Sequence, residues 1–124
     1  MTQAMQAKLV LSHAGVILQS YVLDKESVII GRRDNCDVIL DDPVVSSQHS
    51  RVFRIPSEYL DDHYDYYIED LGSTNGTAVN GEKIRQPTQL KPGDNIKIGR
   101  HRMIFDGGEG IGHEETAILL PDDE

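Results

Sequence analysis

The 124-residue chain is poor in the features that build redox, zinc or membrane-spanning sites. Its one cysteine, Cys36, excludes an internal disulfide and lacks the paired spacing of zinc and redox motifs. No apolar run approaches the roughly 20 residues that a membrane-spanning helix requires. The polar segment 1–7 has no basic stretch followed by an apolar core, which would mark a secretory signal. We therefore expect a cytoplasmic protein without membrane insertion.

Positive charge is also scarce. The chain has 12 Lys and Arg against 21 Asp and Glu, a net charge of −9. Long-range repulsion from nucleic-acid phosphates follows from that charge unless one face is strongly basic. The linear sequence shows no basic stripe, so we expect no nucleic-acid partner. Several arginines gather in the middle of the chain, at Arg32, Arg33, Arg51 and Arg54, which allows a local cationic spot on an acidic body.

Signatures of enzymes are absent as well. The sequence has no Gly-x-x-x-x-Gly-Lys phosphate loop, no Gly-x-Ser-x-Gly elbow and no His-Glu-x-x-His helix motif. Four histidines, His13, His63, His101 and His113, are scattered without the spacing of metal ligands. We therefore expect no catalytic residues, no metal and no cofactor.

The chain does contain short stretches rich in Val, Ile and Tyr, separated by clusters of Gly, Asp, Asn and Pro. This pattern is typical of an all-β sandwich or barrel. The expected strands are 8–12, 16–22, 27–30, 38–40, 51–55, 64–70, 77–79, 84–86, 95–98 and 101–105. Asn80-Gly81 predicts a two-residue hairpin turn, because both positions of that turn need positive φ. The segment 91–94, Lys-Pro-Gly-Asp, predicts a second turn.

The length allows one domain with a hydrophobic core. After residue 106 the composition changes to glycine-rich and then acidic, with a small apolar patch at 118–120. We therefore predict an N-terminal segment at 1–7, a folded domain at 8–106 and a flexible acidic C-terminal tail at 107–124.

Loop segments at the expected strand ends carry donors for an anion: Gly31-Arg32, then 46–49, then 72–77. A phosphate monoester carries nearly two negative charges and three acceptor oxygens. It is held best by a guanidinium, hydroxyl donors and free backbone amides in Gly-rich turns. Taken singly, these features have ordinary explanations, since an arginine after a glycine is usually an exposed turn residue and a loop serine often bonds its own backbone.

Together these residues resemble a known family, the forkhead-associated (FHA) domains, whose pattern is a Gly-Arg after an early strand, a Ser-x-x-His and a later Asn-Gly. The order, the spacing and the strand context of the pattern agree over residues 9–105. The matching segments are Ile30–Arg32, Cys36–Val38, Val45–Val52, Asp70–Thr77 and Val79–Gly81, continued by Leu90, Gly93-Asp94 and Ile98-Gly99.

The resemblance implies a sandwich of two sheets with ten or eleven mainly antiparallel strands, and phosphothreonine bound by loops at one end. It implies that Arg32 bonds the phosphate, that Ser46 gives it a hydroxyl and that Thr74 contributes near it. Asn75 would bond the backbone of the bound peptide. Ser47 stands where the family often has Asn or Arg, and would touch the peptide backbone or the phosphate.

Other positions follow from the same resemblance. Gly31 is expected to be required by the backbone geometry of the site. His49 is expected to hold two binding loops together, and Gly76 to support the site structurally. Val44 would select an apolar residue at the third position after the phosphothreonine.

The expected function is that of an adaptor downstream of Ser/Thr kinases, which binds a phosphothreonine-containing protein. The alternative is a scaffolding module of the same fold that does not need phosphate. The tail adds a hypothesis, because Thr116 has acidic residues before it and apolar residues after it. Some bacterial members of the family carry such a threonine outside the fold, which occupies their own site when it is phosphorylated.

Overall fold

The computed structural model describes residues 7–59 and 63–107. Within these ranges the chain forms eleven strands and no helix, so none of the described part could cross a membrane as a helix. The strands are β1 (Lys8–His13), β2 (Val16–Val22), β3 (Ser27–Gly31), β4 (Val38–Ile39), β5 (Ser50–Pro56), β6 (Tyr64–Asp70), β7 (Thr77–Val79), β8 (Glu82–Lys83), β9 (Thr88–Gln89), β10 (Asn95–Ile98) and β11 (His101–Asp106).

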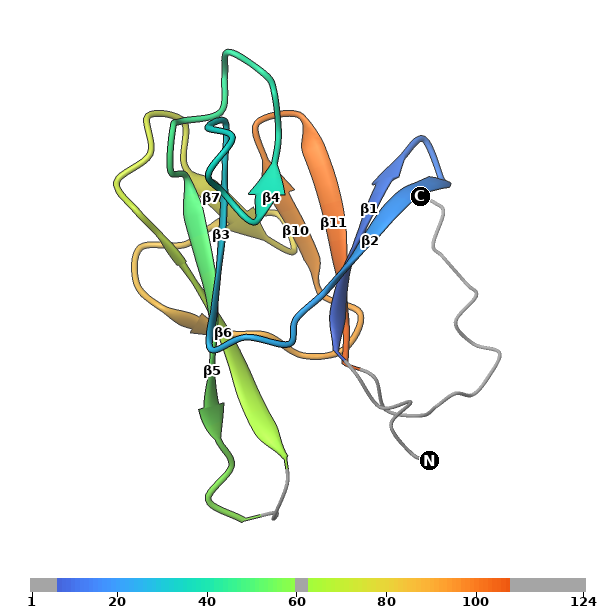
Figure 1. The fold of residues 1–124 in the computed structure, drawn as a ribbon, viewed down its shortest axis with the longest axis vertical. Helices are drawn as coiled ribbons and strands as arrows, with labels where there is room; N and C mark the ends of the chain where they lie inside the picture. Colours follow the sequence, from blue (N-terminus) through green and yellow to red (C-terminus); the bar gives the residue numbers. More distant parts are fainter. Residues whose placement is uncertain (1–6, 60–62, 108–124) are drawn as a thin grey trace.

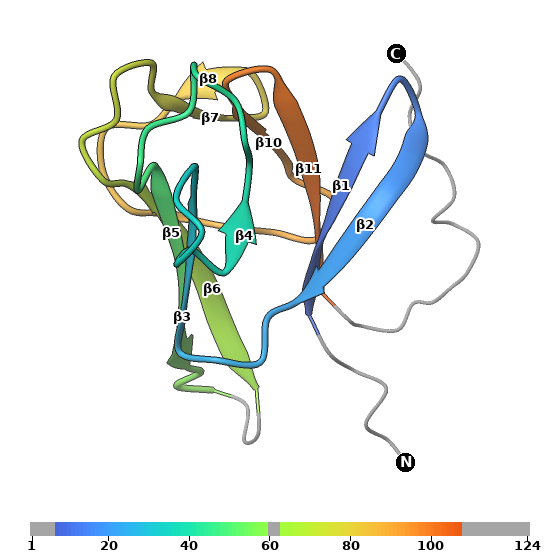
Figure 2. The same cartoon turned by 45° about the horizontal axis from the view of Figure 1, so that its top comes forward.

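The strands form two sheets that face each other (Figures 1 and 2). The six-stranded sheet has the order β2-β1-β11-β10-β7-β8, and the five-stranded sheet has the order β4-β3-β5-β6-β9. Each pair is antiparallel except β3 with β4, which is parallel. The predicted two-sheet, mainly antiparallel sandwich is therefore confirmed. In Figure 1 the loops that follow β3, β4, β6 and β10 gather at the upper end of the sandwich.

Alternating residues from both sheets fill the space between them, as the period of two in a strand requires. The fully buried side chains include Leu9, Ile96, Ile98 and Met103 of the six-stranded sheet, and Ile30, Val38, Val52 and Ile68 of the five-stranded sheet. Each such side chain contributes about 1.5 to 3 kcal/mol to folding by leaving water. Ala7 is buried with them, and its carbonyl accepts a hydrogen bond from the Leu23 amide, so the core begins one residue before β1.

The two turns expected from the sequence are present. Asn80 and Gly81 have φ of 53° and 87°, and they join β7 to β8. In the second turn, Asp94 N donates to Lys91 O immediately before β10.

The predicted strand at 84–86 is wrong. The hairpin ladder ends after Ile84 N donates to Thr77 O, and the chain then crosses to the five-stranded sheet, where β9 pairs with β6. Pro87 follows directly, and proline has no amide hydrogen to donate to a ladder.

Candidate functional site

A hollow of about 410 Å³ lies between the loops that follow β3, β4 and β6. Its walls are Arg32, the segment 43–48, Thr74 and Asn75. The fold thus brings together all five residues expected from the sequence to bind a ligand, although they lie up to 43 positions apart in the chain. The lining holds one arginine and no carboxylate, in a chain whose net charge is −9.

Arg32 provides the positive charge of the hollow. Its backbone amide donates to Ser46 O over 3.0 Å, which fixes the start of the loop. Its guanidinium is exposed and reaches only Pro43 O, at 3.5 Å. By contrast, Arg51 is paired with Glu69. In the described part of the chain Arg32 has no carboxylate partner, so its charge is available to an anionic ligand.

Hydroxyl groups surround this arginine. Ser46 Oγ accepts a hydrogen bond from Thr74 N over 3.1 Å, which joins two of the loops and leaves the hydroxyl proton of Ser46 free to donate. The side-chain hydroxyls of Ser47 and Thr74 have no hydrogen-bond partner in the described ranges. The hollow therefore offers a guanidinium and several hydroxyl donors, two of the kinds of donor that hold a phosphate monoester.

His49 ties the loops together from beneath the hollow. It is fully buried, and its Nδ1 accepts a hydrogen bond from Ser46 N over 3.0 Å. Because Nδ1 accepts, the proton of the neutral ring is on Nε2, which donates to Gly76 O over 2.8 Å. One side chain thus satisfies two backbone groups from loops far apart in the sequence.

Gly31 is needed because another backbone lies against it. A Cβ at this position would lie 2.3 Å from Ser47 O and 2.9 Å from Cys36 Sγ. The Ser47 carbonyl is fixed there, because Arg33 N and Cys36 Sγ both lie within 3.3 Å of it as donors. Gly31 therefore allows β3 and the 46–49 segment to approach, and positive φ is not the reason.

Asn75 and Val44 contact each other across the rim. Asn75 Nδ2 donates to Val44 O over 2.9 Å, which leaves the other amide hydrogen and the carbonyl oxygen of Asn75 for a ligand. Val44 is half-buried and packs against the core, and a Cβ on Gly99 would lie 2.9 Å from Val44 Cγ2. The turn between β10 and β11 thus supports this side of the rim.

A network centred on Asp70 shapes the loop after β6, and sequence reasoning missed it. Asp70 Oδ1 accepts hydrogen bonds from the hydroxyls of Ser73 and Thr77, and Oδ2 accepts from the amides of Gly72 and Ser73. Burial raises the pKa of Asp70, but the hydrogen bonds from Ser73 and Thr77 and the nearby His49 together outweigh it, so the pKa lies below its usual value. Ser73 Oγ also accepts from Gly76 N. The signal in the sequence is the Asp70-x-x-Ser73 spacing, which is typical of a side-chain-closed turn.

Asp42 plays a similar part in the loop after β4. Its Oδ1 accepts from Val44 N, and its Oδ2 lies 3.0 Å from His101 Nε2. The Val44 amide, and then His101 and Arg100, lower the pKa of this carboxyl. Asp42 therefore fastens the 42–45 segment to the β10–β11 turn, and nothing in the sequence pattern pointed to this pairing.

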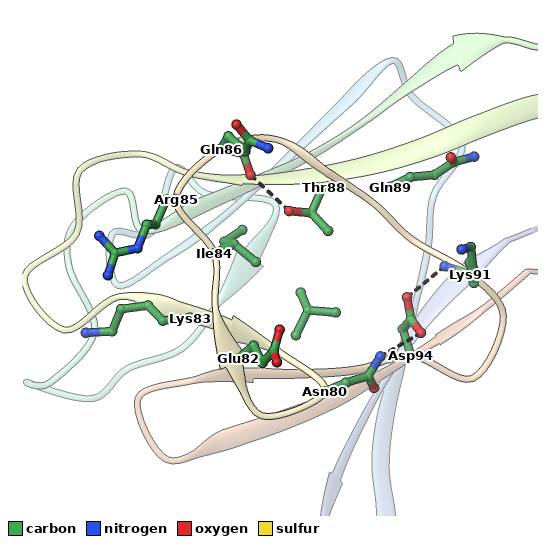
Figure 3. Close-up of a pocket in the computed structure, with 11 residues that line it drawn as sticks. Asn80, Glu82, Lys83, Ile84, Arg85, Gln86, Thr88, Gln89, Lys91 and Asp94 are labelled. Carbon is green, nitrogen blue, oxygen red and sulfur yellow. Dashed lines mark hydrogen bonds between the residues drawn. The ribbon is translucent and has the colours of Figure 1, made fainter.

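A second, larger hollow of about 810 Å³ does not coincide with the predicted residues. It lies between β8 and the 84–91 segment, and its lining mixes Lys83, Arg85 and Lys91 with Glu82 and Asp94 (Figure 3). In the described ranges no three His, Cys, Asp or Glu side chains gather as metal ligands do. Thr116, expected to be a phosphorylation site, lies outside the described residues.

Comparison with known proteins identifies this arrangement of loops. The model of the FHA domain family matches residues 28–99, which is more than half of the chain. The oxoglutarate dehydrogenase inhibitor of Corynebacterium jeikeium is 36% identical over 88 residues, which are 71% of this chain and 56% of that protein. The chain thus spans little more than half the length of this curated relative.

Solved structures agree with the family model. Mycobacterium tuberculosis EmbR, in complex with a low affinity phosphopeptide, superposes with a TM-score of 0.71 at 32% identity, over 85% of this chain and 25% of that one. A structure from work on phosphothreonine-dependent FHA domain interactions superposes with a TM-score of 0.67 at 32% identity, over 82% of this chain and 95% of that one. The chain belongs to the FHA domain family.

Proposed function

We propose that this chain is a phosphothreonine-dependent interaction module, which acts as an adaptor downstream of Ser/Thr kinases and catalyses nothing itself. The observation that carries the proposal is the hollow lined by Arg32 and hydroxyl and amide donors, with no carboxylate, in a molecule whose net charge is −9. Such a site favours a compact, doubly charged anion over a neutral or cationic ligand. The cytoplasm is the proposed location.

The relatives support this proposal. The EmbR structure holds a phosphopeptide, and the second FHA structure comes from work on phosphothreonine-dependent interactions. The relative from Corynebacterium jeikeium is named as an inhibitor of a dehydrogenase, which describes a regulatory protein.

Each residue of the hollow has a role in the proposal. Arg32 bonds the phosphate through its guanidinium, and Ser46 donates its free hydroxyl proton to the same group. Thr74 and Ser47 add their hydroxyls, which have no hydrogen-bond partner among the described residues. Asn75 bonds the peptide backbone with the amide hydrogen and carbonyl oxygen that Val44 leaves free.

The expected affinity is micromolar. Hydrogen bonds to charged groups contribute about 1.5 to 3 kcal/mol each. Ordering a flexible peptide offsets much of that gain. A dissociation constant of roughly 1 μM corresponds to about −8 kcal/mol.

Arg32→Ala tests the site. Removing the guanidinium leaves the bound phosphate without its counter-charge, which is expected to cost about 2 kcal/mol, or roughly 30-fold in affinity. The matched control is Arg33→Ala, because Arg33 is exposed and next in the chain but does not line the hollow. Fluorescence anisotropy with a phosphothreonine peptide measures both.

Wild-type affinity in Arg32→Ala would contradict the assignment. A partner protein that binds equally well to wild type and Arg32→Ala would identify the alternative, a scaffolding module that does not need phosphate.

Two further assignments remain part of this proposal. Val44 lines the hollow and would favour an apolar residue at the third position after the phosphothreonine, because its apolar side chain offers a carboxylate no counter-charge. Phosphorylated Thr116 would occupy the hollow of its own chain and block partners. A Thr116-phosphorylated protein that binds an external phosphopeptide as well as the unmodified protein does would rule out this switch.

A further inference from the structure

The outer face of the six-stranded sheet carries a row of cations that the linear sequence does not reveal. Lys83 of β8 lies opposite Ala78 of β7, Ala78 lies opposite Lys97 of β10, and Lys97 lies opposite Arg102 of β11. Residues opposite one another in a ladder share a face of the sheet, and the alternate residues of β7, β10 and β11 are buried in the core. Lys97 and Arg102 are therefore exposed side by side, with Lys83 on the same face beyond Ala78, and we call these three residues the basic row.

Nothing in the described part of the chain neutralises the basic row. None of its members forms an ion pair or hydrogen bond with a described carboxylate. Elsewhere cations are paired, Lys25 with Asp37 and Arg51 with Glu69. The acidic strand residue of the same face is Asp106, four positions along β11 from Arg102 and therefore about 13 Å away. Neighbouring like charges repel, so the row is best satisfied by an anionic partner.

The basic row adjoins the hollow that Arg32 lines at two points. A Cβ on Gly76 would lie 2.7 Å from Lys83 Cε, so the Lys83 stem crosses the loop directly after Asn75. Gly99 lies in the turn between Lys97 and Arg102, and this turn packs against Val44, which lines the hollow.

Lys83 is not directed toward the acidic groups of the larger hollow. Figure 3 shows Lys83 and Arg85 extended to the same side, away from Asp94. Asp94 is itself engaged, since its two oxygens accept from the Asn80 side-chain amide and from Lys91 N. Arg85, which lines the same hollow, thus adds positive charge on this side.

We infer that the basic row binds acidic residues that flank the phosphothreonine of the partner protein, an inference that rests on the proposed function. Adjacent strands are about 4.8 Å apart, so the row extends about 15 Å from β8 to β11. An extended peptide advances about 3.3 Å per residue, so a flanking stretch of about four to five residues spans the row. Exposed ion pairs are individually weak, and together they should strengthen binding by about three- to tenfold.

The test compares three phosphothreonine peptides with one common centre. One has neutral Gly/Ser flanks, one has four glutamates on the N-terminal side, and one has them on the C-terminal side. The full chain is measured by fluorescence anisotropy as wild type and as Lys97→Gln/Arg102→Gln. The matched control, Lys8→Gln/Lys91→Gln, makes the same change in net charge at the opposite end of the sandwich. There Lys8 lies opposite Asp106 in the β1–β11 ladder, and Lys91 precedes β10.

The inference predicts that one acidic peptide binds wild type about three- to tenfold more tightly than the neutral peptide, and that high salt reduces this gain. The gain should disappear in Lys97→Gln/Arg102→Gln and persist in the control. Equal affinity of wild type for all three peptides would overturn the inference, as would a gain that survives in the variant or is lost equally in the control. Tighter binding of every peptide by the variant would also overturn it, by showing that an acidic segment of the chain itself covers the row.

The neutral peptide separates this inference from the proposed function. If it fails to bind wild type, the phosphothreonine site itself is wrong. If it binds wild type and Lys97→Gln/Arg102→Gln equally, the hollow is intact in the variant, and the comparison with the acidic peptides tests the basic row alone.

Discussion

His49 acts at the scale of a single residue by holding together two loops that form the hollow, without lining the hollow itself. In His49→Leu an apolar side chain of similar size fills the buried space, but Ser46 N and Gly76 O lose their hydrogen-bond partner. Each unsatisfied buried backbone group costs about 1 to 3 kcal/mol. We expect the free energy of unfolding to fall by about 2 to 5 kcal/mol. Phosphopeptide binding should weaken as well, because the two loops are no longer held together. Urea unfolding measures the change, and a loss below about 0.5 kcal/mol, the range of ordinary surface substitutions, would contradict this role.

Gly31 is the second such residue. In Gly31→Ala the new methyl group would stand 2.3 Å from Ser47 O, which is backbone and cannot rotate away. The 46–49 segment must shift, at an expected cost of about 1 to 3 kcal/mol in stability. Because Ser46 and Ser47 line the hollow, affinity for a phosphopeptide should fall as well. Thermal unfolding combined with anisotropy checks both effects, and unchanged values for both would show that the loop does not need this close approach.

The loop between β6 and β7 is organised at the scale of an element by Asp70. Its folded pKa is lower than the unfolded value of about 3.9, so the charged carboxylate stabilises the fold above about pH 4. This contribution is lost as the pH falls below about 4 and through the folded pKa. Asp70→Asn should therefore be less stable than wild type near pH 7, and the difference should narrow in acid.

Urea unfolding over a series of pH values measures that difference directly. The matched control is Asp41→Asn, an exposed carboxylate with no hydrogen bond or ion pair in the described ranges. Its difference from wild type should stay small at every pH. A constant difference between wild type and Asp70→Asn from neutral to acid pH would contradict the proposed role of the Asp70 charge.

At the scale of the whole molecule, local patterns predicted most of the strands. Residues 64–70, 77–79 and 95–98 form strands with the expected bounds, and 95–98 also alternates clearly between polar and apolar residues. The Asn80-Gly81 turn was predictable because few residue pairs tolerate two positive φ values in succession. The predicted strand at 84–86 does not form. The sequence gives no sign that the hairpin ends at Ile84, where the chain leaves for the other sheet.

The residues of the hollow were predictable because a motif fixes their identity and order. The contacts that position them depend on distant pairs, such as His49 with Gly76 and Asp42 with His101, and no local pattern encodes such pairs. The basic row escaped the sequence for the same reason. Lys83, Lys97 and Arg102 become neighbours only through the register of β8, β7, β10 and β11.

We propose above all that the hollow between the three loops binds phosphothreonine. The most direct measurement is an anisotropy titration of wild type with one peptide in three forms, carrying phosphothreonine, phosphoserine or unmodified threonine at the same position. We expect saturable binding of the phosphothreonine form with a dissociation constant of roughly 1 μM, weaker binding of the phosphoserine form and none of the unmodified form. Equal binding of the phosphothreonine and unmodified forms would contradict it.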